Sequence, residues 1–183
     1  MAQALLRHRV PAGEDVHVHS AGLITEGQMA TDHGIAVMSE RGLDLSDHVS
    51  RLLTADLVGG ADLIIGMGRQ HVAETCVLVP EAWSRAFTLK ELVRRGEEVG
   101  PRKPGQTLAE WLADVHWGRS RRDLLGGSRD DDIADPVGKP KPEYERTAVQ
   151  LEALLDRLVH LLWSRAGEEA PERRATGTGW WET

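Results

Sequence analysis

An aspartate in the last third of the chain lies in a setting that suits proton transfer. Asp135 stands directly before Pro136 in the stretch DDIADPVG, within an acidic segment rich in glycine and proline. The proline favours extended backbone at Asp135, which restricts the positions that its carboxylate can occupy. A carboxyl group held in this way can donate a proton to a reacting group or accept one. Asp-Pro is also common in ordinary loops, and we expect the acidic run 130–132 just before it to be a solvated patch.

The single cysteine of the chain, Cys76, offers little as a nucleophile. A reactive cysteine needs cations, a helix N-terminus or backbone amides nearby, because these lower the pKa of the thiol. The residues after Cys76 read VLVPEAW and supply no positive charge. We therefore interpret Cys76 as a buried structural thiol. One cysteine also excludes an internal disulfide and most zinc sites.

Four polar residues earlier in the chain are candidates for metal binding or for hydrogen bonding. His17 and His19 would share one face of a strand, as a pair of metal ligands can, but no third ligand follows at a useful spacing. A surface strand explains the two histidines more simply. Ser20, at the end of that strand, and His48, in SDHVSRLLT, suit capping or hydrogen-bonding roles. We predict no metal and no cofactor.

The elements that would position these residues include two clear strand patterns. Residues 14–20 alternate between polar and apolar, which predicts a strand, and a nearly continuous apolar run predicts a second strand over 63–67. The run 77–79 suggests a further short strand. AFTLKELVRR predicts a short strand or turn that leads into a helix near Leu89.

Helical patterns separate these strands. MAQALLRHR predicts a helix that ends in cations before Pro11, and ATDHGIAVMSERG predicts another that Gly42 can end in the left-handed conformation. Thr54 and Thr107 are suited to begin two more helices. The longest helix is predicted over about 143–163, where leucines recur at helical spacing along one stripe.

This alternation predicts one α/β domain over residues 1–165, followed by a disordered tail over 166–183. The 183 residues are 40% hydrophobic, which is enough for one core. A net charge of −7 argues against a nucleic-acid partner. With no apolar leader and no apolar run near the length that spans a bilayer, we expect a cytoplasmic protein with no membrane partner.

Four segments, taken together and in order, resemble a known family. HSAGL, ERGLDLSDHVSRLLT, ADLIIGM and ADPVG resemble the low-molecular-weight protein tyrosine phosphatases, and LVPEAW and FTLKELVRR are similar to their bacterial branch. The resemblance implies a three-layer α/β/α fold with a short parallel sheet, of the phosphotyrosine protein phosphatase I-like type. It implies a phosphorylated protein or a small phosphomonoester as substrate, and leaves the oligomeric state open.

The resemblance also implies a mechanism, of which this chain supplies part. In the family, a cysteine thiolate in a Cys-x5-Arg loop attacks phosphorus, and an aspartic acid, here Asp135, protonates the leaving oxygen. Ser20 and His48 fall where the family keeps residues that brace the phosphate loop. The sixth residue after Cys76 is Ala82, and no Cys-x5-Arg pattern occurs in the 183 residues. The resemblance therefore assigns no nucleophile.

The opening MAQALL resembles the helix that follows the phosphate loop in the family. We therefore expect that the first, central strand and the loop are missing here, that the functional protein is longer, and that these 183 residues alone are inactive. Two departures weaken the expected preference for phosphotyrosine. Val137 stands where an aromatic residue is common, and Gly68 where an acidic residue is frequent.

The sequence supports three hypotheses about function. The first is a phosphatase whose full product is longer and acts on tyrosine-like or small phosphomonoesters. The second is a non-catalytic pseudo-phosphatase that serves as a binding module. The third, a small structural or interaction protein, rests only on the long C-terminal helix and the tryptophan-rich tail, and we rank it last.

Overall fold

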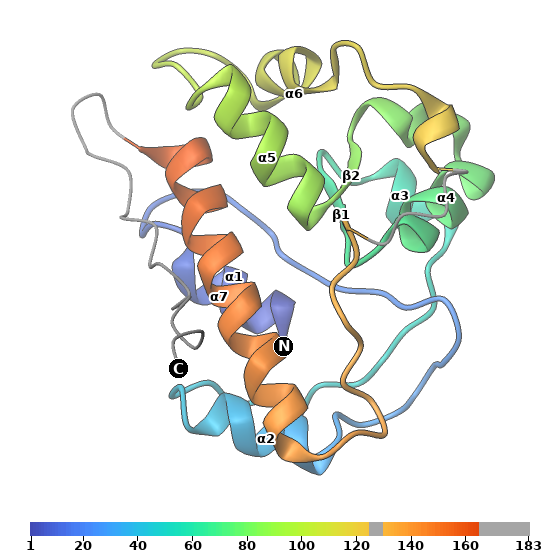
Figure 1. Ribbon diagram of the computed structural model, residues 1–183, viewed down its shortest axis with the longest axis vertical. Coiled ribbons are helices and arrows are strands. Elements are labelled where there is room, and N and C mark those ends of the chain that lie inside the picture. The colour runs from blue at the N-terminus through green and yellow to red at the C-terminus, as the bar shows by residue number, and fades with distance from the viewer. Residues whose placement is uncertain (125–129, 165–183) are drawn as a thin grey trace, which may run out of the picture.

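The structure is a computed structural model that describes residues 1–124 and 130–164 (Figure 1). Its elements alternate between helices and strands, as the sequence predicts. In chain order they are α1 (Ala2–Arg9), α2 (Asp32–Ser39), α3 (Ala55–Gly59), β1 (Ile64–Gly66), α4 (Arg69–Leu78), the 3-10 helix η1 (Pro80–Ser84), β2 (Ala86–Thr88), α5 (Leu89–Val99), α6 (Leu108–His116), the 3-10 helix η2 (Arg121–Leu124) and α7 (Lys141–Trp163).

The two strands run parallel and form one sheet, with Ile65 opposite Phe87. The strand predicted over 63–67 is confirmed, one residue shorter at each end. The strand predicted just before the helix near Leu89 is confirmed as β2. Parallel pairing needs a crossover connection, and α4 with η1 supplies it.

Each face of the sheet packs against its own core. Phe87 belongs to the larger core, which it shares with side chains of α1, α2, α5, α6 and α7. Ala86, its neighbour on the strand, belongs to a smaller core with Val72 and Trp83. Successive strand residues point to opposite faces, so the two cores lie on opposite sides of the sheet. The three-layer α/β/α fold is therefore confirmed.

Helix α7 is the longest element, and α1, α2 and α5 pack against it (Figure 1). The helices predicted at the N-terminus, after Thr54, after Thr107 and near the C-terminus are all present. At α6 the Thr107 hydroxyl accepts a hydrogen bond from the backbone N–H of Glu110, whose carboxylate accepts one from the N–H of Thr107. Gly42 follows α2 with a φ of 72°, as predicted.

The strand predicted over 14–20 is wrong, because these residues adopt no regular structure. A strand forms only where another strand satisfies its backbone groups. One edge of β1 is taken by β2, and a cleft separates the other edge from residues 14–20. Val16, one of the apolar residues of the pattern, is 41% exposed as a result.

The short strand suggested over 77–79 is also wrong. Val77 and Leu78 lie in the last turn of α4, and both side chains are exposed. Val79 follows in extended backbone and donates its N–H to the carbonyl of Thr75, which closes the helix. A short apolar run does not by itself distinguish a strand from a helix end, and here the preceding helix continues through it.

The tail predicted to be disordered, 166–183, lies outside the described residues, as does 125–129. Among the helices of the described ranges, none combines the length and the apolar character that crossing a membrane requires.

Candidate active site

Two of the three predicted site residues, Ser20 and His48, line the same cleft. The cleft encloses about 660 Å³ alongside α1, from Met1 at its start to Arg7 in its last turn, and Arg51 lines it as well. Segments far apart in the sequence therefore meet at the start of α1.

Ser20 is held between the first helix and the segment that carries Arg51. Its hydroxyl donates a 2.7 Å hydrogen bond to Oε1 of Gln3 on α1. Its carbonyl accepts a 2.8 Å hydrogen bond from Nε of Arg51. Gln3 in turn donates from Nε2 to the carbonyl of Val18. Ser20 thus fixes the position of α1 relative to the irregular segment 14–20, which ends at Ser20.

His48 faces positive charge at the same place. Burial lowers its pKa, and the positive amino group at the start of the chain lowers it further. Burial likewise lowers the pKa of the Met1 amino group. Helix α1 begins without a side-chain cap, so its first N–H groups and its dipole present positive charge toward the cleft. The free N–H groups of this helix end suit an anion better than a cation, whether or not Met1 carries a free amino group.

Asp135 does not line that cleft. Its side chain is exposed, and its Oδ1 accepts a 3.0 Å hydrogen bond from the backbone N–H of Val137. The carbonyl of Ala134 accepts a hydrogen bond from the hydroxyl of Thr147 on α7. The structure therefore brings together Ser20 and His48, while Asp135 stands on a separate loop with its carboxylate accessible.

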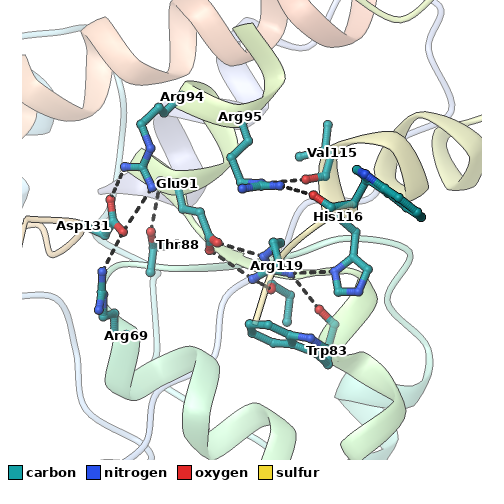
Figure 2. Close-up of polar contacts among 12 residues, drawn as sticks. Arg69, Trp83, Thr88, Glu91, Arg94, Arg95, Val115, His116, Arg119 and Asp131 are labelled. Atoms are coloured by element: carbon teal, nitrogen blue, oxygen red, sulfur yellow. Dashed lines mark hydrogen bonds and ion pairs between the residues drawn. The ribbon is translucent and has the colours of Figure 1, made fainter. Parts of the chain in front are cut away.

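The expectation that residues 130–132 form a solvated patch holds for Asp130, which is exposed, but is wrong for Asp131 and Asp132. The Asp131 side chain is buried and forms ion pairs with Arg69 and Arg94 (Figure 2). Burial disfavours its charge, but the two guanidinium groups outweigh this effect and hold the pKa of Asp131 below its ordinary value. Asp132 accepts a hydrogen bond from the backbone N–H of Arg69. Sequence reasoning missed both contacts because the partners lie far away in the chain.

Cys76 is half-buried rather than buried. Burial raises the pKa of its thiol, and the nearby charges of Arg121 and Arg119 oppose that rise without cancelling it. A thiol with a raised pKa holds little thiolate at neutral pH. The surroundings of Cys76 thus agree with its interpretation as a structural residue.

The two histidines before Ser20 carry no metal-site geometry. His17 and His19 are both exposed on the irregular segment. Within residues 1–124 and 130–164, no three residues among His, Cys, Asp and Glu gather as a metal would require.

A second cleft, of about 820 Å³, separates residues 14–20 from the free edge of β1. Its walls include Val16 and Val18 on one side, Ile65 on the other, and Leu155 and Leu158 of α7. In the described part of the chain, no strand pairs with this edge of β1. No pattern in the sequence itself predicted this cleft. Only the family resemblance did so, because it implies a strand between residues 14–20 and β1.

Comparison with known proteins adds to this geometry. The profile of the family described as "Low molecular weight phosphotyrosine protein phosphatase" matches residues 1–107. A Ralstonia solanacearum protein named probable low molecular weight protein-tyrosine-phosphatase EpsP is 34% identical over 119 residues, 64% of this chain and 80% of that protein. A protein-arginine-phosphatase of Geobacillus stearothermophilus is 29% identical over 163 residues, 88% of this chain and 86% of that protein.

A solved structure resembles this chain with an identity close to that of the Geobacillus protein. The low molecular weight protein tyrosine phosphatase from T. tengcongensis superposes with a TM-score of 0.63 at 28% identity, and the match covers 88% of each chain. These findings agree with the resemblance seen in the sequence.

Proposed function

We propose, since the chain belongs to the low molecular weight phosphotyrosine protein phosphatase family, that it is the scaffold and acid-bearing part of a phosphoprotein phosphatase. Ser20 and His48 brace the phosphate-binding loop, and Asp135 is the general acid. The observation that carries this proposal is the cleft at the start of α1, where Ser20, His48 and the uncapped helix end meet.

The proposed reaction has two steps. A cysteine thiolate attacks phosphorus, so that a sulfur–phosphorus bond forms and the bond to the leaving group breaks. Asp135 gives its proton to the leaving atom as that bond breaks. Water then attacks phosphorus and gives a proton to the Asp135 carboxylate, while the sulfur–phosphorus bond breaks, which restores the thiolate and releases inorganic phosphate. Ser20 and His48 do not touch the reacting atoms and act through the loop that they support.

The nucleophile does not come from the 183 residues. No Cys-x5-Arg pattern occurs in them, and Cys76 lies in the smaller core region rather than at the cleft beside α1. We therefore propose that these residues alone do not hydrolyse phosphate esters. The cleft between residues 14–20 and the edge of β1 supports the entry of one more strand there, which would deliver the loop to the start of α1.

We propose a phosphorylated protein side chain as the physiological substrate. The Ralstonia relative is named as a tyrosine phosphatase and the Geobacillus relative as an arginine phosphatase. Val137, two residues after Asp135, is 64% exposed and offers an aliphatic surface where an aromatic wall would favour a phenol ring. The proposal includes no cofactor, no nucleic-acid or membrane partner, and a cytoplasmic location.

The test compares two proteins in the hydrolysis of p-nitrophenyl phosphate. The 183-residue chain is expected to show no turnover. A fusion that carries, ahead of Met1, a β-strand followed by a Cys-x5-Arg loop of the family pattern is expected to hydrolyse the ester, and replacing the added cysteine by serine should abolish that activity. Vanadate-sensitive turnover by the 183 residues alone would overturn the proposed dependence on the added loop. A folded but inactive fusion would instead favour the non-catalytic binding module.

A further inference from the structure

The segment that leads to Asp135 is attached to other elements at successive residues. The backbone N–H of Ile133 donates a 2.7 Å hydrogen bond to the carbonyl of Met67, at the end of β1. Lys90 on α5 donates to the carbonyls of Asp130 and Asp132, at 3.1 and 2.6 Å. The segment is therefore held from several sides before the chain reaches Asp135.

Asp131, which is only 5% exposed, attaches this segment through ion pairs. Its Oδ1 lies 2.5 Å from Nη1 of Arg94 on α5, and its Oδ2 lies 3.2 Å from Nη2 of Arg69 on α4. Figure 2 shows the carboxylate between the two guanidinium groups. Two cations from two different helices thus fix the orientation of one carboxylate.

Asp132 fixes the segment to the same helix by a different contact. Its Oδ1 accepts a 2.8 Å hydrogen bond from the N–H of Arg69, the first residue of α4. Helix α4 has no cap from its own N-cap residue, Gly68, so Asp132 takes that role from a distant part of the chain. A Cβ atom at position 68 would lie 2.8 Å from that Oδ1, so glycine there permits the contact.

We propose that Asp131, held by Arg69 and Arg94, is a positioning residue that fixes the loop carrying Asp135. The proposal rests on the proposed function, in which Asp135 is the general acid. Asp131 touches no reacting atom and acts through the backbone of the residues between it and Asp135. A buried ion pair is weak evidence for stability alone, because desolvation offsets much of its attraction. Its geometric constraint on the loop is what the reaction uses.

The first test measures hydrogen exchange in the 183-residue chain and needs no enzymatic activity. In D131N, the amides of Ile133 and Val137 are expected to exchange about tenfold faster or more, because the loop loses its charged anchor. Amides of α7 should keep their exchange rates, which shows that the fold is intact. The matched control is E97Q, which removes an exposed carboxylate on α5 that pairs with Arg157. Equal loop exchange in D131N and E97Q would overturn the proposal.

A second variant covers the case in which D131N fails to fold. Arg94 is half-exposed, so R94Q leaves no large buried gap and keeps the pair between Asp131 and Arg69. It is expected to speed exchange at the same amides by a smaller factor. No change at those amides in R94Q would count against the proposal.

The activity test uses the active fusion and two substrates. D131N should lower kcat for an alkyl phosphate, whose leaving oxygen needs the proton of Asp135, far more than for p-nitrophenyl phosphate, with KM unchanged. A merely structural role would lower both rates equally, and that result would overturn the proposal. If the unmodified fusion hydrolyses neither ester, the proposed function fails, while the exchange experiment still decides whether Asp131 positions the loop.

Discussion

Asp135 is the residue on which the proposed chemistry depends most directly. In the active fusion, Asp135→Asn is expected to lower kcat for an alkyl phosphate by about 10²–10⁴-fold, because the amide cannot give a proton to the leaving oxygen. The loss should be much smaller for p-nitrophenyl phosphate, whose leaving group departs as a stable anion. Asp32→Asn, an exposed carboxylate at the start of α2, is the matched control and should leave both rates unchanged. A loss of similar size for both esters would remove Asp135 from the role of acid.

His116 couples the stability of the protein to pH. Burial lowers its pKa below the ordinary value of 6.5, and the charges of Arg119 and Arg95 lower it further. Nη1 of Arg119 lies 3.2 Å from Nδ1 of His116, a contact that suits the neutral ring (Figure 2). As the pH falls through the unfolded pKa, the unfolded state binds a proton before the folded state does. Stability is therefore lost as the pH falls below about 6.5.

The variant His116→Asn tests this coupling by urea unfolding between about pH 7.5 and pH 5.5. Asparagine keeps an acceptor but does not titrate, so the free energy of unfolding should fall less across this range than in the parent chain. His48, whose pKa burial and the N-terminal amino group also lower, accounts for part of the remaining slope. The same loss of stability in both proteins would contradict the assignment to His116.

At the scale of the element, the close packing of α5 depends on one glycine. A Cβ atom at Gly96 would lie 2.9 Å from Cδ1 of Leu161 and 3.0 Å from Cζ2 of Trp111, on α7 and α6. Alanine is the better helix former by about 1 kcal/mol, but overpacking costs about 1–3 kcal/mol. Gly96→Ala should therefore lower the free energy of unfolding in urea. Gly59→Ala, where a Cβ meets nothing within 4 Å, should leave it unchanged or raise it.

Helices with local start signals and a long apolar stripe could be predicted from the sequence. The cap of α6 needs only Thr107 and Glu110, three residues apart, and the stripe of α7 repeats within one segment. Such interactions involve neighbours in the chain, so pattern alone suffices. The family resemblance supplied the sheet order and the candidate roles of Ser20, His48 and Asp135.

Features that depend on distant partners could not be predicted in the same way. Residues 14–20 have a strand pattern, but a strand also needs a paired neighbour, and among residues 1–124 and 130–164 none lies beside them. The acidic run 130–132 has the composition of a solvated segment, yet Asp131 is buried because Arg94 and Arg69 pair with its carboxylate. These partners stand 37 and 62 residues before it in the chain, so the local sequence does not reveal them. Charge at a single position does not reveal which cations the fold will bring to it.

At the scale of the whole molecule, the cleft between residues 14–20 and β1 opens the apolar interior along the edge of β1 that no strand of the described residues covers. Val16, Val18, Ile65 and Leu158 line it, so apolar surface and backbone groups both face open space. A strand that filled the cleft would bury apolar side chains on two sides and satisfy the edge of β1. Adding the whole strand should therefore raise the free energy of unfolding more than changing any one residue of the cleft would.

The dye anilinonaphthalene sulfonate reports this difference, because its fluorescence rises on exposed apolar surface. The 183-residue chain is expected to enhance the fluorescence, and the fusion that carries the added strand and loop to enhance it less. The fusion should also raise the free energy of unfolding in urea by about 2–4 kcal/mol, since burial of the strand exceeds the entropy lost in ordering it. A fusion with a glycine-serine segment of equal length is the matched control and should change neither quantity. Equal dye binding by all three proteins would mean that no strand enters the cleft, and that the phosphate loop must reach α1 from another direction.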